Sequence, residues 1–443
     1  MKIFKRILLV ILVLLGIAIF FNYPKLNFIS GYASKNLASS HFIAHRDYSD
    51  IINNDNNMPL IKLAELSKVE GENVTASVYD LMPRETVCRE GLGCALITDG
   101  YDATIKLPVP RRSILENNLP FPYGNSGTKD SVFTNINYDG INNAINGVLS
   151  DYETQMTRTV MVIYKDHIIA EEYIEGFSKD TRILGWSMTK SVLATLYGIL
   201  EYQGKLDVTS PAPVASWKND ERKSITLNNL LRMQSGLEWE EDYASISDVT
   251  KMLFMEADMP SVQMNKEAIA APTEIWNYSS GTTNLLSGIL RDQFKTHQEY
   301  VDFPYQELID KIGMNSMIME ADIAGNFVGS SYGWATTRDW AKFGLLYLHR
   351  GNWNETQLFA PEWTDYVSRP TKNSDGVYGA HFWLNAGGKY PDVPRDMYSV
   401  NGFQGQRVYI IPSKDLVVVR TGLGQEPLFD VNKFLGELSA AIN

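Results

Sequence analysis

The stretch Gly185-Trp186-Ser187-Met188-Thr189-Lys190 opens a run of apolar residues that are spaced for a helix. The apolar residues that share one face of this helix are Met188, Val192, Leu193, Leu196 and Leu200. Their spacing predicts a helix buried along one side, and Gly204 is a suitable residue to end it.

Ser187 and Lys190 stand at the start of this helix in a Ser-x-x-Lys pattern. Unpaired backbone amides and the helix dipole favour negative charge at that end, and residues three apart share a helix face. A serine hydroxyl needs a neighbouring base to become a nucleophile. A lysine can be that base when burial and nearby cations lower its pKa. The pair therefore predicts a nucleophile and its base, and the alternative is an N-cap serine followed by a solvated lysine.

A second Ser-x-x-Lys pattern, from Ser126 to Lys129, lies among Pro, Gly and Asn residues that are typical of turns. No helical pattern follows it, so we interpret it as a loop. A short motif becomes informative only when its structural context agrees.

Length and composition indicate a packed globular protein with one large core and an appendage. The chain has 443 residues, of which 44% are apolar and 21% are charged. Its net charge is −12; residues 1–26 hold four basic and no acidic residues, so the remainder carries 36 basic against 52 acidic residues, or −16. No basic surface is left to neutralise phosphates, which argues against a nucleic-acid partner.

The N-terminus resembles an export signal. Lys2, Lys5 and Arg6 precede an uninterrupted apolar run from Ile7 to Phe21. Fifteen residues are slightly short for a full membrane span of about 17–25 residues. We predict that residues 1–26 form an uncleaved signal anchor, with the basic end cytoplasmic and the body exported to the periplasm. The alternative is a signal peptide cleaved near Gly31-Tyr32-Ala33, which would release the body into the periplasm.

The two cysteines, Cys88 and Cys94, stand in a short glycine-containing segment. In an exported protein this spacing is compatible with a disulfide, and two free thiols are the alternative. Without histidine neighbours they do not make a zinc site.

Residues 27–134 are predicted to form a small N-terminal region and connector. Residues 27–60 are mixed and polar, and Asn53 to Asn57 mark a loop. We expect a small β-rich region over residues 61–110, whose short apolar runs include Ala95 to Ile97 and Tyr101 to Leu107, and then a connector from Pro108 to Thr128.

Residues 135–443 are predicted to form the main domain. A hairpin is expected from two β-rich runs, at 159–164 and 168–173, and two further strands at 407–411 and 416–420. Helices are expected at 225–236, 337–348 and 430–442. The order predicts an α+β fold, with an antiparallel sheet flanked by helices and a separate helical lobe.

Tyr278 lies in the turn before another apolar-striped helix, in Tyr278-Ser279-Ser280-Gly281. Close to Lys190, its pKa is expected to fall, and it would then carry the proton from Ser187 to a leaving group. A buried structural tyrosine is the alternative.

Ser187-x-x-Lys190, then Tyr278-x-Ser280, then a glycine-rich strand start followed by a Pro-turned hairpin, resemble the serine β-lactamase and penicillin-binding-protein superfamily. The segment from Asn401 to Pro412 and the helix that starts near Thr337 are most similar to the class C-like branch, and within it to 6-aminohexanoate-dimer hydrolases and esterase-like relatives. The resemblance covers about residues 135–440.

This resemblance implies a β-lactamase/transpeptidase-like fold and acyl transfer without a cofactor or metal. Ser187 would attack a carbonyl, Lys190 would be its base and Tyr278 its acid/base partner. The backbone amides of Ser187 and Phe403 would form the oxyanion hole. The family's third motif often carries a cation, whereas the corresponding triplet here is Val400-Asn401-Gly402. A β-lactam carboxylate therefore lacks an obvious partner, which favours small-molecule ester or amide substrates. The alternatives are D-Ala-D-Ala carboxypeptidase or β-lactamase activity, or an inactive relative that binds cell-wall peptides.

Two other sites compete with this hypothesis. Gly329-Ser330-Ser331-Tyr332-Gly333 fits Gly-x-Ser-x-Gly, with His349 or His381 downstream, but lacks the flanking strand and helix of a nucleophile elbow. His41 and His45 have the spacing of a zinc motif but lack its glutamate. The residues expected near the pocket walls are Tyr243, Trp276, Trp334 and His381. The sequence predicts no oligomeric state.

Overall fold

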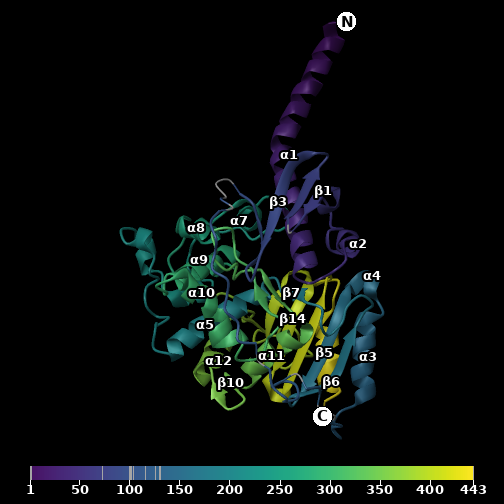
Figure 1. The fold of residues 1–443 in the computed structure, drawn as a ribbon, viewed down its shortest axis with the longest axis vertical. Coiled ribbons are helices and arrows are strands. Elements are labelled where there is room, and N and C mark those ends of the chain that lie inside the picture. Colours follow the sequence, from purple (N-terminus) through teal and green to yellow (C-terminus); the bar gives the residue numbers. More distant parts are fainter. Residues whose placement is uncertain are drawn as a thin grey trace.

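The computed structural model describes residues 2–442 apart from 72, 99–101, 103, 115, 125, 129 and 130. Its centre is a six-stranded antiparallel sheet in the order β12-β13-β14-β15-β5-β6 (Figure 1). The strands are β5 (Thr157–Tyr164), β6 (His167–Tyr173), β12 (Trp383–Leu384), β13 (Tyr398–Gly402), β14 (Gln406–Ile411) and β15 (Leu416–Gly422). The predicted hairpin and the predicted C-terminal strands are confirmed, and they join where β15 pairs with β5.

Helices cover both faces of this sheet. Val160 and Val162 of β5 face α3 (Tyr138–Leu149) and α13 (Val431–Ala440), whereas Met161 and Ile163 face the core that holds α5 (Met188–Tyr202) and α11 (Thr337–Leu348). Successive side chains of a strand point to opposite faces, so an unbroken apolar run such as β5 is buried on both. The α+β architecture expected from the sequence is therefore confirmed.

A helical lobe lies beside the sheet. Its helices are α6 (Leu227–Leu231), α7 (Asp248–Met255), α8 (Met259–Met264), α9 (Ser280–Arg291), α10 (His297–Pro304) and α12 (Pro361–Ser368). A small sheet of β7 (Ile183–Leu184), β9 (Gly333–Ala335) and β8 (Ile318–Met319) joins the lobe to α5. Short elements elsewhere are α2 (Tyr48–Asp50), α4 (Tyr152–Gln155), β10 (Asn352–Trp353), β11 (Thr356–Gln357) and the single turns η1 (Ile51–Asp55), η2 (Ile61–Leu63), η3 (Ala215–Trp217), η4 (Glu221–Ser224), η5 (Tyr305–Ile309), η6 (Phe403–Gly405) and η7 (Pro412–Lys414).

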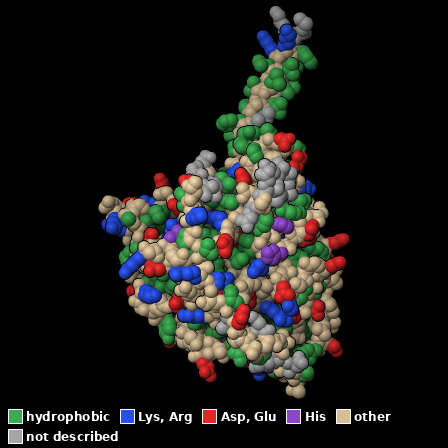
Figure 2. All heavy atoms as spheres, viewed as in Figure 1, with side chains coloured by type: hydrophobic (Ala, Val, Ile, Leu, Met, Phe, Trp, Pro, Cys, Tyr) green, Lys and Arg blue, Asp and Glu red, His purple; other side chains and the backbone are tan. Residues whose placement is uncertain are grey.

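The N-terminal helix, α1 (Lys2–Phe42), is much longer than expected. Its first half projects from the body and carries exposed apolar side chains (Figures 1 and 2). Its second half is buried, through Phe28, Ile29, Tyr32, Ala33 and Leu37. Residues 27–42 are mixed in composition, but their apolar members recur at helical spacing and continue the helix into the body.

The expected β-rich N-terminal region is a four-stranded antiparallel sheet that packs on α1. It consists of β1 (Glu65–Glu70), β2 (Asn73–Val78), β3 (Leu81–Arg89) and β4 (Gly93–Leu96). Cys88 and Cys94 face each other across β3 and β4 and form a disulfide. The strand expected from Tyr101 to Leu107 lies partly outside the described residues, and residues 104–107 form no strand.

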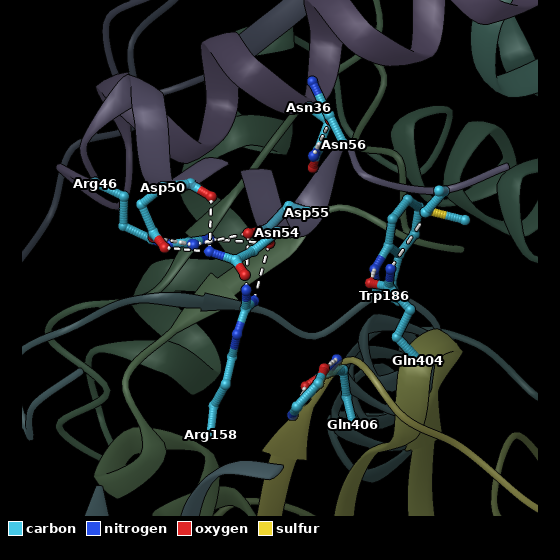
Figure 3. A network of polar contacts seen from close by, with 12 residues as sticks. Asn36, Arg46, Asp50, Asn54, Asp55, Asn56, Arg158, Trp186, Gln404 and Gln406 are labelled. Carbon is cyan, nitrogen blue, oxygen red and sulfur yellow. Dashed lines mark hydrogen bonds and ion pairs between the residues drawn. The ribbon is translucent and has the colours of Figure 1, made fainter. Parts of the chain in front are cut away.

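Two buried ionic clusters hold the N-terminal region against the main domain. The Asp55 carboxylate accepts hydrogen bonds from Arg46 and from Arg158 at the start of β5 (Figure 3). The Glu320 carboxylate accepts hydrogen bonds from the Lys35 Nζ and from the Trp334 indole, both at 2.8 Å. Buried charges of this kind require partners, so the helix and the domain are built as one unit.

Candidate active site

The turn between β7 and α5 presents Ser187. Gly185 lies where an added Cβ would stand 2.3 Å from the Trp340 ring, and Trp186 has a left-handed backbone with φ of 48°. Ser187 follows as the N-cap residue, but its side chain makes no capping hydrogen bond. The alternative of an ordinary N-cap serine is therefore wrong, and the hydroxyl is left for other partners.

Lys190 is buried, with 2% of its surface exposed. Its Nζ donates hydrogen bonds to the Ser187 Oγ at 3.0 Å, the Ser280 Oγ at 2.9 Å and the Ser330 carbonyl oxygen at 2.9 Å. Burial lowers the pKa of Lys190 to about 8, against a smaller opposing effect of the nearby Glu241 carboxylate. The alternative of a solvated lysine is also wrong.

Tyr278 lies against this pair at the start of α9. Its ring centre is 4.9 Å from the Lys190 Nζ, and the nearby Ser187 hydroxyl acts to lower the pKa of the phenol. The expectation that its pKa would fall is wrong. Burial, and then the negative charge of Glu241, raise the pKa of Tyr278 well above its usual value. Tyr278 is therefore a protonated phenol in the resting site.

Glu241 is a member of the cluster that the sequence did not reveal. Its carboxylate accepts hydrogen bonds from the Ser280 backbone N–H at 2.8 Å, from the Ser280 hydroxyl and from the Tyr243 hydroxyl at 3.1 Å. Ser280 in turn accepts from Lys190. Glu241 thus orients Ser280 and places a negative charge behind the lysine. In sequence it is one acid among several in a loop, and no spacing links it to Ser187.

The end of β13 comes very close to the Ser187 turn. A Cβ at Gly402 would lie 2.0 Å from the Gly185 carbonyl oxygen, so only glycine permits this approach. Phe403 follows directly. Within the described part of the chain, the backbone N–H groups of Ser187 and Phe403 donate no hydrogen bond. Their place as an oxyanion hole stays a prediction, with two unused donors on adjoining segments.

A cleft of about 490 Å³ opens in front of Ser187. Its wall includes Tyr243, stacked on Phe403 at 5.1 Å between ring centres, and Trp383, which contacts Tyr278. Of the expected wall residues, Tyr243 lines the cleft and Trp276 packs behind Trp383. Trp334 and His381 do not line it. His381 is buried, with its ring nitrogens against the Leu231 carbonyl and the Thr283 hydroxyl.

The cleft also contains cations. Arg407 of β14 pairs with Asn401 across the ladder and lines the cleft together with Lys389. Lys389 is paired with Glu426 at 2.6 Å, whereas the Arg407 guanidinium donates hydrogen bonds to the carbonyl oxygens of Gly402 and Gln406. The triplet Val400-Asn401-Gly402 lacks a cation, but the opposing strand supplies one that the sequence pattern did not indicate.

The competing motifs do not assemble into sites. The Ser330 hydroxyl is buried against the Ser331 hydroxyl, and His349 pairs with Asp166. His41 stacks on Tyr48, and no group of metal-binding side chains gathers among the described residues. In the second Ser-x-x-Lys pattern, Ser126 lies in a bend and Lys129 lies outside the described residues.

The main domain is similar to known proteins. The beta-lactamase family model matches residues 148–432. The 6-aminohexanoate-dimer hydrolase of Paenarthrobacter ureafaciens is 21% identical over 304 residues, which are 62% of this chain and 74% of that protein. A family VIII carboxylesterase superposes with a TM-score of 0.54 at 15% identity, over 71% of this chain and 98% of its own. A penicillin-binding-protein homologue from Caulobacter crescentus gives 0.52 at 14% identity, over 71% and 99%.

The fold is that of the β-lactamase-fold hydrolase family. The chain belongs to the beta-lactamase family, and its relatives include a 6-aminohexanoate-dimer hydrolase.

Proposed function

We propose that this protein is a serine hydrolase that cleaves ester or amide bonds of small molecules through an acyl-enzyme on Ser187. The observation that carries the proposal is the contact between the buried Lys190 amine and the Ser187 hydroxyl at 3.0 Å. An amine whose pKa is lowered to about 8 is partly neutral near neutral pH, and it can then accept the serine proton.

The proton route follows from the three side chains. Lys190 takes the proton of Ser187 as the Ser187 Oγ forms its bond to the substrate carbonyl carbon. Tyr278, protonated at rest, gives its proton to the leaving group as the bond between the carbonyl carbon and the leaving group breaks. Tyr278 then receives the proton held by Lys190. Water then attacks the acyl-enzyme by the same route in reverse. The negative oxygen of each tetrahedral intermediate is stabilised by the Ser187 and Phe403 amides.

The side chains that line the cleft favour one class of substrate. Aromatic and aliphatic side chains dominate its wall, which suits an apolar acyl or aryl group. The names of two similar proteins, a 6-aminohexanoate-dimer hydrolase and a family VIII carboxylesterase, support the same class. The second candidate is a carboxylate-bearing substrate such as a D-Ala-D-Ala peptide or a β-lactam, which is favoured by Arg407 in the cleft.

We further propose that α1 is an uncleaved membrane anchor and that the body is exported. The projecting half of α1 is long and apolar enough to cross a membrane. The distant cleavage candidate, Gly31-Tyr32-Ala33, is buried in the same helix, where Tyr32 packs on Trp186. Removal of these residues would expose the core beside the nucleophile.

The test is hydrolysis of a substrate panel by the purified full chain: p-nitrophenyl esters, linear amides, D-Ala-D-Ala peptides and nitrocefin. We expect turnover of esters or amides that is lost in Ser187→Ala and kept in the control Ser126→Ala, which changes the exposed serine of the second Ser-x-x-Lys pattern. Turnover of all substrates at the wild-type rate by Ser187→Ala would overturn the proposal. Absence of turnover and of covalent labelling in the wild type would instead favour a binding protein.

A further inference from the structure

Four exposed apolar side chains lie at the end of the N-terminal sheet that is nearest to the projecting half of α1. The β2–β3 hairpin turns there through Tyr79, which is 66% exposed, and Leu81, which is 45% exposed. Leu60 and Leu63, just before β1, are exposed beside the same end of the sheet. We call these four residues the collar.

Two hydrogen bonds between β3 and α1 set the position of the collar along α1. The Ser34 hydroxyl lies 2.8 Å from the Thr86 hydroxyl, and the Arg84 guanidinium donates to the Asn27 side chain at 2.7 Å. Lower residue numbers in β3 therefore lie beside lower residue numbers in α1. The hairpin runs beside the helix towards its projecting end (Figure 1).

The hairpin tip reaches the apolar half of the helix. A strand rises about 3.3 Å per residue and a helix about 1.5 Å. The Ser34 and Thr86 side chains are short, so their contact places the two backbones at the same level. The tip at Asp80, six residues before Thr86, lies about 20 Å beyond it, which corresponds to roughly thirteen helical residues before Ser34. That level is the end of the apolar run of α1, at Phe21.

We propose that the collar is a second membrane contact, with Tyr79 and Leu81 inserted at the boundary between lipid headgroups and acyl chains. The inference rests on the proposed membrane anchoring of α1. A bilayer that surrounds the apolar half of α1 covers the hairpin tip as well, and a tyrosine beside a leucine suits the interface, where one end of the side chain is wet. Because the hairpin packs on the same helix that forms the anchor, two contacts would restrict the tilt of the body on the membrane.

The test uses site-specific fluorescence in the full chain. Both native cysteines are held in the Cys88–Cys94 disulfide, so one introduced cysteine can be labelled selectively. Tyr79→Cys and Leu81→Cys are labelled with an environment-sensitive fluorophore and reconstituted into phosphatidylcholine and phosphatidylglycerol vesicles, with or without headgroup-proximal doxyl lipids. The matched control is Val132→Cys, because Val132 is apolar and 87% exposed. Its neighbour Phe133 packs on Tyr164 at the C-terminal end of β5, whereas the N-terminal region contacts Arg158 at the other end of that strand.

We expect doxyl lipids to remove about half of the fluorescence at positions 79 and 81 and to leave position 132 unchanged, because interfacial groups lie about 5–10 Å deep. Iodide in the water should show the reverse order. If the protein floats with the vesicles and doxyl lipids quench positions 79 and 132 equally, the membrane contact of the collar is overturned, but the anchor is not. Failure to float would overturn the anchor and the collar together. Energy transfer between copies at position 79, without doxyl quenching, would show that a second copy covers the collar.

Discussion

Lys190 gives the account its clearest pH dependence. The neutral amine is the base, so the rate of acylation must rise as pH rises through the pKa of about 8. We expect kcat/KM for an ester substrate to increase between about pH 6 and 9 and then to level off. The measurement is a pH profile with the Ser187→Ala protein as the blank for uncatalysed hydrolysis. A rate that falls over this range would contradict the role of Lys190.

Glu241 provides the matched variants for that profile. Its negative charge holds the pKa of Lys190 up, so Glu241→Gln should move the midpoint to lower pH. The neighbouring Glu240 is exposed, and Glu240→Gln should leave the midpoint unchanged. The same midpoint in all three proteins would show that Lys190 does not titrate in the profile.

The sequence predicts some of these residues and misses others for physical reasons. Ser187 and Lys190 follow from helical spacing, because three residues along one helix fix their contact. Tyr278 is found by its place before a helix, but its pKa depends on burial and on Glu241, which no local pattern shows. Arg407 enters the cleft only because β14 pairs with β13.

At the scale of elements, Gly402 decides how closely β13 approaches the nucleophile turn. Gly402→Ala places a Cβ on the Gly185 carbonyl oxygen and must push the strand end away. We expect a loss of about 100-fold in acylation rate, as for other displacements of about 1 Å in an active site. In the control Gly147→Ala, the new methyl group meets no atom within 4 Å, and the rate should stay unchanged. A wild-type acylation rate in Gly402→Ala would contradict the role of β13 in the site.

The Asp55 cluster is predicted to be essential for the stability of the body. Asp55→Asn leaves the buried guanidinium groups of Arg46 and Arg158 without their carboxylate, which costs about 3–5 kcal/mol. Thermal unfolding in detergent measures the loss. Asp180→Asn removes an exposed pair with Lys179 and should cost less than about 1 kcal/mol.

The Asp55 contribution also has a defined pH window. Its arginine partners hold the pKa of Asp55 below its usual range. This stabilisation is therefore present above the unfolded pKa of about 4 and is lost as pH falls below it. The difference between wild type and Asp55→Asn should shrink in acid. Equal unfolding temperatures at neutral pH would contradict the role of the cluster.

For the whole molecule, we expect the mature protein to keep its N-terminal helix. Mass spectrometry of the membrane fraction should find peptides from the first 26 residues and an uncut segment around Tyr32. A mature N-terminus after Ala33, in a folded and active protein, would contradict the anchor.

The class of fold could be predicted from the sequence because the hairpin, the C-terminal strands and the Ser187 helix each have strong local patterns. The continuation of α1 to Phe42 is not evident from the sequence, because serines interrupt its buried face. These serines pack against the N-terminal sheet and Glu320. Such polar residues resemble a loop until their partners, distant in sequence, are known.

Covalent labelling at Ser187 tests the central claim most directly. The full chain is treated with a fluorophosphonate probe, and the modified residue is mapped by peptide mass spectrometry. The account predicts one adduct, on Ser187, that forms at the wild-type rate in Ser126→Ala and is abolished in Lys190→Ala. An adduct on another serine, or labelling of Lys190→Ala at the wild-type rate, would contradict it.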